Sequence, residues 1–266
     1  MAPGGRSGRD RQKFDRVPLF GRALPGLRAQ VDRDLRRRRL SRDRVAACVV
    51  RLIDLQFFRV GNPEYAKRNQ SYGITTLREE HATPGASIVE FDFVGKSGKR
   101  HRRRVREPRI ARVIAKLLEI PGSEVFRFFD EDGLVHKLRS RDVNAYVKRH
   151  MGEEFTAKDF RTWGGTSIVA TSLIACDPSE LDSASGQQRV LREAIRDAAA
   201  HLGNTASVTR SAYVDPLVLA AVERPDVVRK VRRSRARMRS RRYLTVDEQA
   251  TLALIAAMRR ASRRKR

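Results

Sequence analysis

Four residues in separate segments have the side chains needed to break a phosphodiester bond without a metal ion. That reaction needs a nucleophile aimed at phosphorus, cations that hold the non-bridging oxygens, and an acid for the leaving oxygen. Tyr213 could supply the nucleophile, while Arg59, Lys96 and Arg161 could supply the cations and the acid. Their types therefore indicate phosphoryl transfer, provided that the fold brings them together.

The overall charge indicates a polyanionic partner. The 266 residues include 57 Lys and Arg against 31 Asp and Glu, which gives a net charge of +26 and a pI of about 11.4. A protein that binds an anionic membrane usually concentrates its cations on one amphipathic helix, whereas arginine recurs along this whole chain. Nucleic acid is therefore the favoured partner, and no membrane is expected.

Several other classes find no support. The chain has no glycine-rich phosphate loop and no His-Glu metal motif, so we expect no cofactor and no metal. Cys48 and Cys176 lack a partner at ligand spacing and are both expected to pack in the core. No apolar run is long enough to span a bilayer, and Met1 to Phe14 do not resemble a signal peptide. We expect a cytoplasmic, nucleoid-associated protein.

The hydrophobic spacing predicts a mostly helical α+β fold with one small antiparallel sheet. Alternation from Ser87 to Val105 predicts a β-hairpin with Lys96 at its tip. Val125 to Phe129 is expected to form a brief strand or a turn, and steps of three and four residues predict helices. The main predicted helices cover Leu27 to Leu40, Val45 to Phe57, Pro108 to Leu118, Ala157 to Ala175 and Gln188 to Leu202.

Two helix ends carry clear signals. Gly203 can adopt the left-handed conformation that ends a helix, so Gly203-Asn204-Thr205 is expected to join two helices. Thr245 and Glu248 have the spacing of a capping box, which predicts a further helix over 245–258.

Four motifs in the same order resemble the type IB DNA topoisomerases, specifically their poxviral and bacterial branch. The matching segments cover roughly residues 13 to 220 and are Phe58-Arg59-Val60-Gly61 with Tyr65, Phe93-Val94-Gly95-Lys96, Lys158-Asp159-Phe160-Arg161-Thr162-Trp163-Gly164, and Gly203-Asn204-Thr205 with Arg210-Ser211-Ala212-Tyr213. The resemblance implies the catalytic domain that this family shares with the tyrosine recombinases. It also implies an enzyme, expected to be a monomer, that relaxes supercoiled double-stranded DNA without ATP or metal.

The resemblance also assigns roles. Tyr213 would attack one strand to form a 3′-phosphotyrosyl link, and Arg59, Lys96, Arg161 and Asn204 would complete the catalytic set. Asn204 stands where the poxviral and nuclear members have histidine; its amide can donate a hydrogen bond but cannot titrate. His201, one helical turn earlier, is not expected to replace it. The implied DNA-binding residues are Gly61, Tyr65, Tyr72, His81, Lys99, Arg102 and Lys158.

The resemblance divides the chain into three parts. Residues 1–12 are expected to form a flexible basic N-terminus, 13–222 the catalytic domain, and 223–266 an Arg-rich extension that assists DNA binding. Family members usually carry a small β-rich domain before the segment that begins near Lys13. This sequence does not include that domain, so the expected explanations are a fragment, a misplaced start or a natural catalytic-domain-only protein. Without that domain, we expect weaker binding to duplex.

Two alternatives remain open. A tyrosine recombinase would use a similar domain and nucleophile, but recombinases generally have His-x-x-Arg where this chain has Lys158-x-x-Arg161. A non-catalytic basic DNA-binding protein would also explain the charge.

Overall fold

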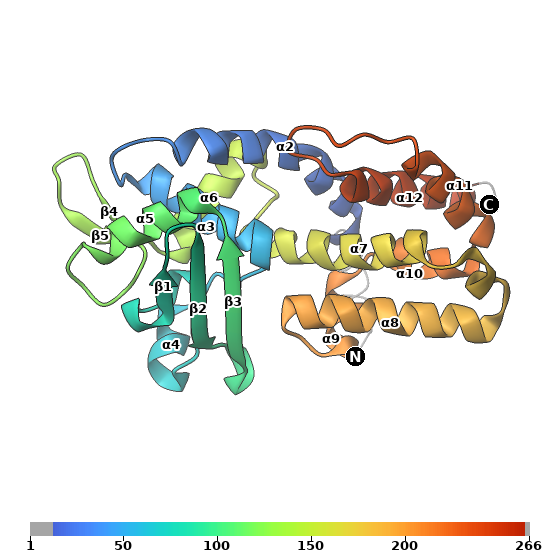
Figure 1. Ribbon diagram of the computed structural model, residues 1–266, viewed down its shortest axis with the longest axis horizontal. Helices are drawn as coiled ribbons and strands as arrows, with labels where there is room; N and C mark the ends of the chain where they lie inside the picture. Colours follow the sequence, from blue (N-terminus) through green and yellow to red (C-terminus); the bar gives the residue numbers. More distant parts are fainter. Residues whose placement is uncertain (1–12, 264–266) are drawn as a thin grey trace, which may run out of the picture. The chain divides into compact units, whose positions relative to one another are not determined.

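The computed structural model describes residues 13–263, which form two compact units (Figure 1). Of the described residues, the first unit contains 13–25 together with 161–263, and the second contains Gly26–Phe160. Helices α2 (Val17–Asp34) and α7 (Ala157–Ala175) each contribute residues to both units. The prediction for residues 1–12 lies outside the described residues.

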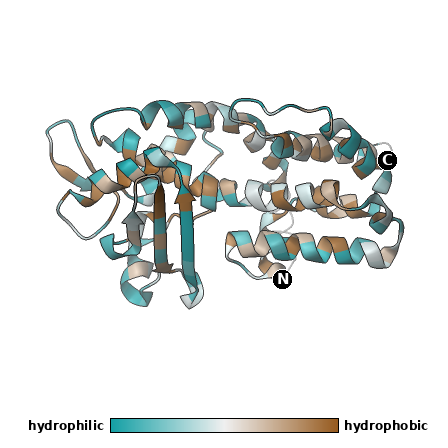
Figure 2. Cartoon of the chain, in the orientation of Figure 1, coloured by the Kyte–Doolittle hydropathy of each residue, from teal (hydrophilic) through white to brown (hydrophobic). Residues whose placement is uncertain are grey.

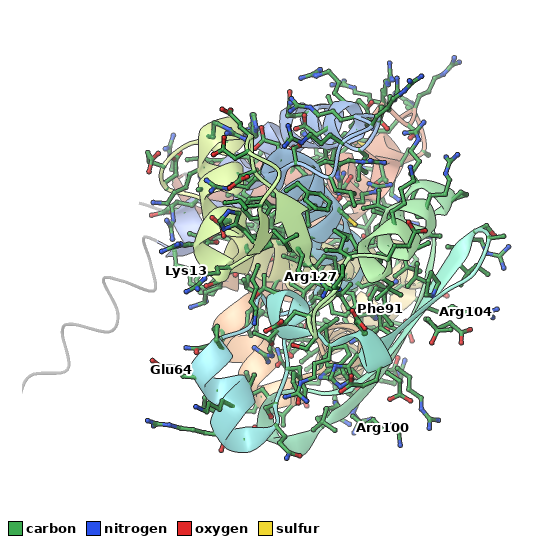
Figure 3. All side chains as sticks on the ribbon, turned by 90° about the vertical axis from the view of Figure 1, so that its left-hand side faces the viewer. Lys13, Glu64, Phe91, Arg100, Arg104 and Arg127 are labelled. Carbon is green, nitrogen blue, oxygen red and sulfur yellow. The ribbon has the colours of Figure 1, made fainter. Side chains whose placement is uncertain are left out.

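The second unit is built on the predicted hairpin. Strands β2 (Ile88–Val94) and β3 (Arg100–Arg106) pair in antiparallel register, and β1 (Ala82–Pro84) extends the sheet beside β2. Val89, Phe91 and Phe93 are buried, as their alternation predicts. Figure 2 shows the contrast between the hydrophobic β2 and the hydrophilic β3, whose Arg100 and Arg104 extend away from the sheet in Figure 3.

Helices and a second hairpin complete this unit. The helices are α3 (Arg42–Gln56), α4 (Pro63–Asn69), α5 (Pro108–Leu118) and α6 (Ser140–Met151), with short helices η1 (Ile74–Thr76), η2 (Glu79–His81) and η3 (Lys96–Gly98). β4 (Arg127–Phe129) pairs with β5 (Val135–Lys137), which confirms a strand in the predicted segment.

Within residues 13–25 and 161–263, the first unit is helical. It holds α8 (Ala184–Leu202), α9 (Ala206–Tyr213), α10 (Pro216–Ala220), α11 (Pro225–Arg235) and α12 (Val246–Arg263), with η4 (Pro178–Asp182) and η5 (Ala221–Glu223) between them. The capping box is present, because the Glu248 carboxylate accepts from the Thr245 N–H at 2.9 Å and the Thr245 hydroxyl accepts from the Glu248 N–H at 3.2 Å. The mostly helical α+β fold is confirmed.

The structure differs from the predicted elements in several places. Helix α2 begins ten residues before Leu27 despite Pro25 inside it, and it ends at Asp34 rather than Leu40. A proline removes one helical hydrogen bond, a cost that burial of Phe20 and Leu24 offsets. Part of the arginine block forms α11, and the last helix continues beyond residue 258 to Arg263. Cys176 is half-exposed at the end of α7, so its predicted place in the core is wrong.

Candidate active site

The predicted catalytic residues fall into two groups, one in each unit. Arg161, Asn204 and Tyr213 belong to the first unit, and Arg59 and Lys96 belong to the second. The contacts described below that position each group lie within its own unit.

Tyr213 is the last residue of a short helix whose start is tightly defined. Gly203 ends α8 in the left-handed conformation (φ 64°), and the Asn204 N–H donates to the Ala199 carbonyl at 3.0 Å. Thr205 then begins α9 by accepting a hydrogen bond from the Val208 N–H at 3.3 Å. Asn204 therefore lies in a fixed joint between two helices, as predicted from Gly203.

Two cations lie against the Tyr213 ring. The guanidinium of Arg161 lies 5.1 Å from the ring centroid, and the ammonium of Lys13 lies 5.7 Å from it. Both cationic groups also hold nearby backbone: Arg161 donates to the Leu202 carbonyl at 2.8 Å, and Lys13 donates to the Ala212 carbonyl. Arg161 is 4% exposed and Tyr213 is 8% exposed. The tyrosine is thus enclosed together with positive charge, which favours a nearby anion.

Helix α7 fixes the backbone beyond Tyr213. A side chain at Gly165 would lie 2.6 Å from the Tyr213 carbonyl oxygen, so glycine permits this close packing. The Thr166 hydroxyl donates to that carbonyl at 3.4 Å and accepts from the Asp215 N–H at 3.0 Å. Asp215 is buried, and burial raises its pKa to about 6.

In the second unit, a close backbone approach fixes the segment of Arg59. The Arg59 carbonyl accepts from the Ile74 N–H at 2.8 Å, and the Val60 carbonyl accepts from the Thr75 N–H at 2.8 Å. Gly61 has φ +101°, and a side chain at Gly73 would lie 2.4 Å from Gly61 backbone atoms. Glycine is therefore required at both positions. Gly61 therefore has a conformational role, and its contact with DNA stays a prediction.

Aromatic packing against strand β2 also positions the segment that carries Arg59. Phe58, the residue before Arg59, lies edge-on to Phe91 with ring centroids 5.2 Å apart and stacks with Phe93 at 5.8 Å. The half-buried Arg59 is consequently held beside strand β2.

Lys96 lies in the exposed turn between β2 and β3, as predicted. The Gly95 N–H donates to the Lys99 carbonyl at 2.8 Å, while Ser97 adopts a left-handed conformation with φ 64°. The Gly95 carbonyl also accepts from the Ser71 hydroxyl at 2.8 Å. The backbone of this turn is thereby defined while the Lys96 side chain stays exposed to solvent.

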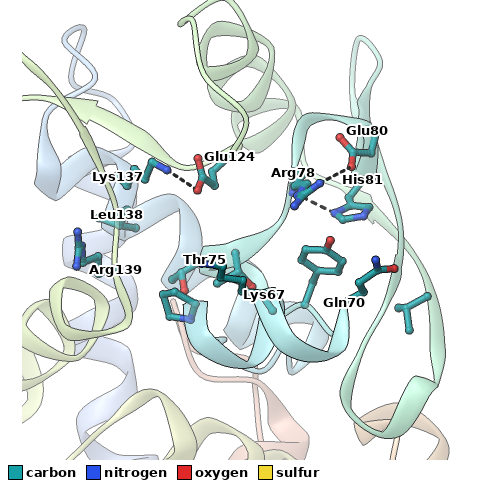
Figure 4. Close-up of a pocket in the computed structure, with 15 residues that line it drawn as sticks. Lys67, Gln70, Thr75, Arg78, Glu80, His81, Glu124, Lys137, Leu138 and Arg139 are labelled. Atoms are coloured by element: carbon teal, nitrogen blue, oxygen red, sulfur yellow. Dashed lines mark hydrogen bonds and ion pairs between the residues drawn. The ribbon is translucent and has the colours of Figure 1, made fainter.

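Tyr72 and His81 line one cavity of about 690 Å³ in the second unit, shown in Figure 4. Their ring centroids lie 4.4 Å apart. His81 Nδ1 accepts from the Arg78 N–H at 3.0 Å, and burial lowers the pKa of His81. The neutral ring therefore carries its proton on Nε2 and can donate from that atom.

The other predicted DNA-binding side chains are exposed on separate elements. Tyr65 is 50% exposed on α4, Lys99 follows the hairpin turn, and Lys158 lies in the first turn of α7. Arg102 on β3 pairs with Asp92, their nearest atoms 3.3 Å apart. A phosphate at Arg102 would have to compete with this carboxylate.

Lys13 is the site residue that sequence reasoning missed. It precedes Tyr213 by 200 positions, and nothing in its local pattern links the two residues. Thr166 was also missed, because a threonine inside a helix ordinarily bonds within its own helix.

No group of three or more potential metal ligands occurs among residues 13–263. Over the same residues, no helix combines the length and the apolar character that a membrane crossing needs.

Comparison with known proteins decides the family. The model of the family described as "Eukaryotic DNA topoisomerase I, catalytic core" matches residues 4–238. The chain belongs to the type IB DNA topoisomerases. This confirms the family predicted from the four motifs.

Relatives of this type IB chain include viral and eukaryotic proteins. A DNA topoisomerase 1B of Acanthamoeba polyphaga mimivirus is 30% identical over 216 residues, which cover 78% of this chain and 63% of that protein. A DNA topoisomerase 1B of Vaccinia virus is 25% identical over 177 residues, covering 66% and 53%. A DNA topoisomerase 1 of Daucus carota is 30% identical over 170 residues, covering 62% and 20%. The chain thus spans less than two thirds of each of these relatives.

Proposed function

We propose that this chain relaxes supercoiled duplex DNA by cutting and rejoining one strand. The Tyr213 phenolic oxygen attacks a phosphorus atom, the bond from phosphorus to the 5′ oxygen breaks, and a 3′-phosphotyrosyl link forms. The Tyr213 proton passes to solvent, and Lys96 donates a proton to the departing 5′ oxygen. After the free strand has swivelled, the 5′ hydroxyl attacks the phosphotyrosyl link, which reverses each transfer and reseals the strand.

One observation carries the proposal: the cations of Arg161 and Lys13 both lie close to the enclosed Tyr213 ring. One cation near a tyrosine ring also occurs at the buried Tyr146, where the Arg149 guanidinium lies 5.6 Å from the centroid, whereas Tyr213 has two cations beside its ring. A phosphate approaching the phenol would meet both charges, and charge that develops on its oxygens would be stabilised in surroundings of low dielectric constant.

The remaining roles follow the family resemblance. Arg161 and Arg59 each offer a planar fork suited to two phosphate oxygens, and the Asn204 amide donates a further hydrogen bond. Tyr65, Tyr72, His81, Lys99, Arg102 and Lys158, with the backbone at Gly61, contact the DNA around the cut phosphate. We infer that the reaction proceeds with EDTA and without ATP.

The substrate grip is electrostatic. With a net charge of +26, most of the affinity comes from phosphate contacts that release counterions. The affinity for duplex should therefore fall steeply with salt. A monomer associated with the nucleoid fits this sequence-independent grip.

A suicide-substrate assay tests the proposal. A nicked duplex that loses its 5′ strand after cleavage should trap a covalent complex on a denaturing gel. Tyr213→Phe should abolish the complex while leaving duplex binding nearly intact, because one phenolic oxygen is removed.

Tyr243→Phe is the matched control. Tyr243 also has a cation over its ring, since the Arg242 guanidinium lies 5.0 Å from the centroid. The control should form the complex at the wild-type rate. A wild-type chain that binds duplex yet forms no complex would favour the non-catalytic DNA-binding alternative.

Plasmid relaxation separates the proposal from the recombinase alternative. The chain should relax a supercoiled plasmid that carries no special site. A requirement for paired recognition sites would instead indicate a recombinase.

A further inference from the structure

A small cavity in the second unit is lined almost entirely by positive charge. It has a volume of about 320 Å³ and lies where the connection between α2 and α3 meets helices α3 and α5. Seven of its eight lining residues are arginine or lysine, and no carboxylate lines it among the described residues. Such a concentration of one sign of charge raises the local concentration of anions.

Three of these cations pair with carboxylates outside the cavity lining. Arg36 and Arg109 both pair with Asp32, and Arg37 pairs with Asp34 at 2.8 Å. Because Arg36 and Arg109 share one carboxylate, these pairs offset the three positive charges only in part.

Four cations are left over. Within residues 13–263, Arg38, Arg44, Arg112 and Lys116 contact no carboxylate. The cavity therefore carries an excess of at least four positive charges that the chain does not compensate.

Arg44 sets this cavity apart from an ordinary solvated basic surface. Its side chain is 7% exposed, and one guanidinium nitrogen donates to the Arg38 carbonyl at 2.6 Å. Its Nε is buried and has no hydrogen-bond partner in the described part of the chain. Burial, together with the nearby Arg112, lowers the pKa of Arg44. A buried cation with an unused donor is costly unless an anion accepts from it.

The cavity is remote from the hairpin turn that carries Lys96. Helix α5 begins two residues after β3 ends, and β3 runs for about 20 Å from that turn at 3.3 Å per residue. Figure 1 shows α5 at the end of the sheet opposite the turn between β2 and β3.

We propose that this cavity binds a small free oxyanion with several negative charges, of the inorganic pyrophosphate and oligophosphate class. Phosphate oxygens suit the planar donors of Arg44 and Arg112. A volume of about 320 Å³ is large enough to admit a short phosphate chain. A compact ligand can reach the enclosed Arg44, whereas the phosphates of a duplex lie on a wide convex surface.

Calorimetric titration of the full chain with sodium pyrophosphate at constant ionic strength tests this site. The wild type should bind one equivalent at the cavity. The double variant Arg112→Ala, Lys116→Ala should weaken that binding roughly tenfold or more, since two charge-assisted contacts are lost. Both residues are exposed on α5, so the variant should fold.

The matched control is Arg192→Ala, Arg196→Ala. These residues are also exposed and lie one helical turn apart on α8 in the first unit. Replacing them removes the same two positive charges as the α5 double variant. The control should change pyrophosphate affinity by no more than about twofold, as expected for screened distant charges. Equal weakening in both double variants would overturn the proposal, because it would indicate diffuse attraction.

Arg44→Gln tests the buried donor, with circular dichroism used to check its fold. A folded variant should also lose roughly tenfold in affinity; a folded variant with unchanged affinity would overturn the proposal. If Arg44→Gln fails to fold, the pyrophosphate affinity of the α5 double variant still tests the proposal.

A final titration tests whether the cavity binds a free anion or the phosphates of the DNA backbone. Saturating duplex should leave pyrophosphate binding at the cavity intact. Loss of that binding would assign the cavity to DNA phosphates and overturn the proposal. None of these readouts requires strand cleavage, so failure here is distinguishable from failure of the proposed function.

Discussion

The two units present their candidate catalytic groups in opposite ways. In the first unit, Arg161 and Tyr213 are 4% and 8% exposed, and backbone carbonyls hold the cations beside the ring. In the second unit, Lys96 is exposed and its position depends on the hairpin backbone.

This difference shows two routes to a defined functional group. A buried guanidinium must be partnered, so its position is fixed by the contacts that offset its desolvation. An exposed lysine has no such requirement, and a rigid turn can place it without enclosing it. We therefore expect changes in the first unit to alter chemistry and stability together, and changes at Lys96 to alter chemistry alone.

Arg161→Ala should have the largest effect on cleavage. Loss of one preorganised donor at a developing oxyanion costs roughly 10²–10³-fold in rate, and we place this variant at the upper end because Arg161 also lies over Tyr213. Arg161→Lys should restore little, since an ammonium lacks the planar fork. Single-turnover cleavage of the suicide substrate measures both variants.

Arg149→Ala is the control for this prediction. Arg149 lies over the Tyr146 ring at 5.6 Å, so its removal also deletes an arginine from a tyrosine face. Cleavage should stay at the wild-type rate. If Arg161→Ala cleaves as fast as this control, the first unit does not hold the phosphate.

Lys96→Ala should have the next largest effect. Loss of a general acid slows cleavage by roughly 10²-fold or more, while the free energy of unfolding should change by less than about 0.5 kcal/mol because the side chain is exposed. A substrate with a 5′-thio leaving group needs no acid and should restore the rate.

Lys99→Ala sharpens the result, since Lys99 is also exposed on the same hairpin turn. It should weaken DNA binding without slowing cleavage at saturating enzyme. A Lys96→Ala variant that shows no rescue by the thio substrate would move the proton donor elsewhere.

Gly73→Ala tests whether the second unit needs its tight backbone. The added carbon would lie 2.4 Å from Gly61 backbone atoms, so the variant should lose about 3 kcal/mol of unfolding free energy. Gly26→Ala, in α2 with open space around it, should instead stabilise the chain by about 0.5–1 kcal/mol. Urea unfolding measures both, and equal effects would contradict the close approach.

The sequence predicted what local patterns control. The alternation of Val89, Phe91 and Phe93 defined the hairpin, and Gly203 defined the joint before α9. The four motifs defined the family because their residue types and order are specific.

Contacts between distant segments could not be predicted. Lys13 meets Tyr213 across 200 positions, and the charge balance around Arg44 depends on a helix that begins at Pro108. Tyrosines show the same limit: Tyr146 is buried with its hydroxyl donating to Asp34 at 2.7 Å, a structural role that its local sequence does not separate from that of Tyr213.

Asp215→Asn should have the smallest effect of the set, and it probes the buried backbone next to Tyr213. Burial raises the pKa of Asp215 from its usual value to about 6. Between about pH 4 and 6 the folded chain keeps a proton that the unfolded chain has released. This group's contribution to stability is therefore greatest at low pH and declines as pH rises to about 6.

Asparagine cannot ionise, yet it can still accept from the Leu217 N–H, the bond by which Asp215 caps α10. The unfolding free energy of the variant, minus that of the wild type, should therefore rise by about 2 kcal/mol between pH 4 and pH 7. Carboxyls with a lowered pKa, such as Asp130, act equally in both chains and cancel in this difference. Urea unfolding at several pH values measures it, and a difference that stays constant with pH would show that folding leaves the Asp215 pKa unchanged, so that the first unit is no more restrictive toward charge than the second.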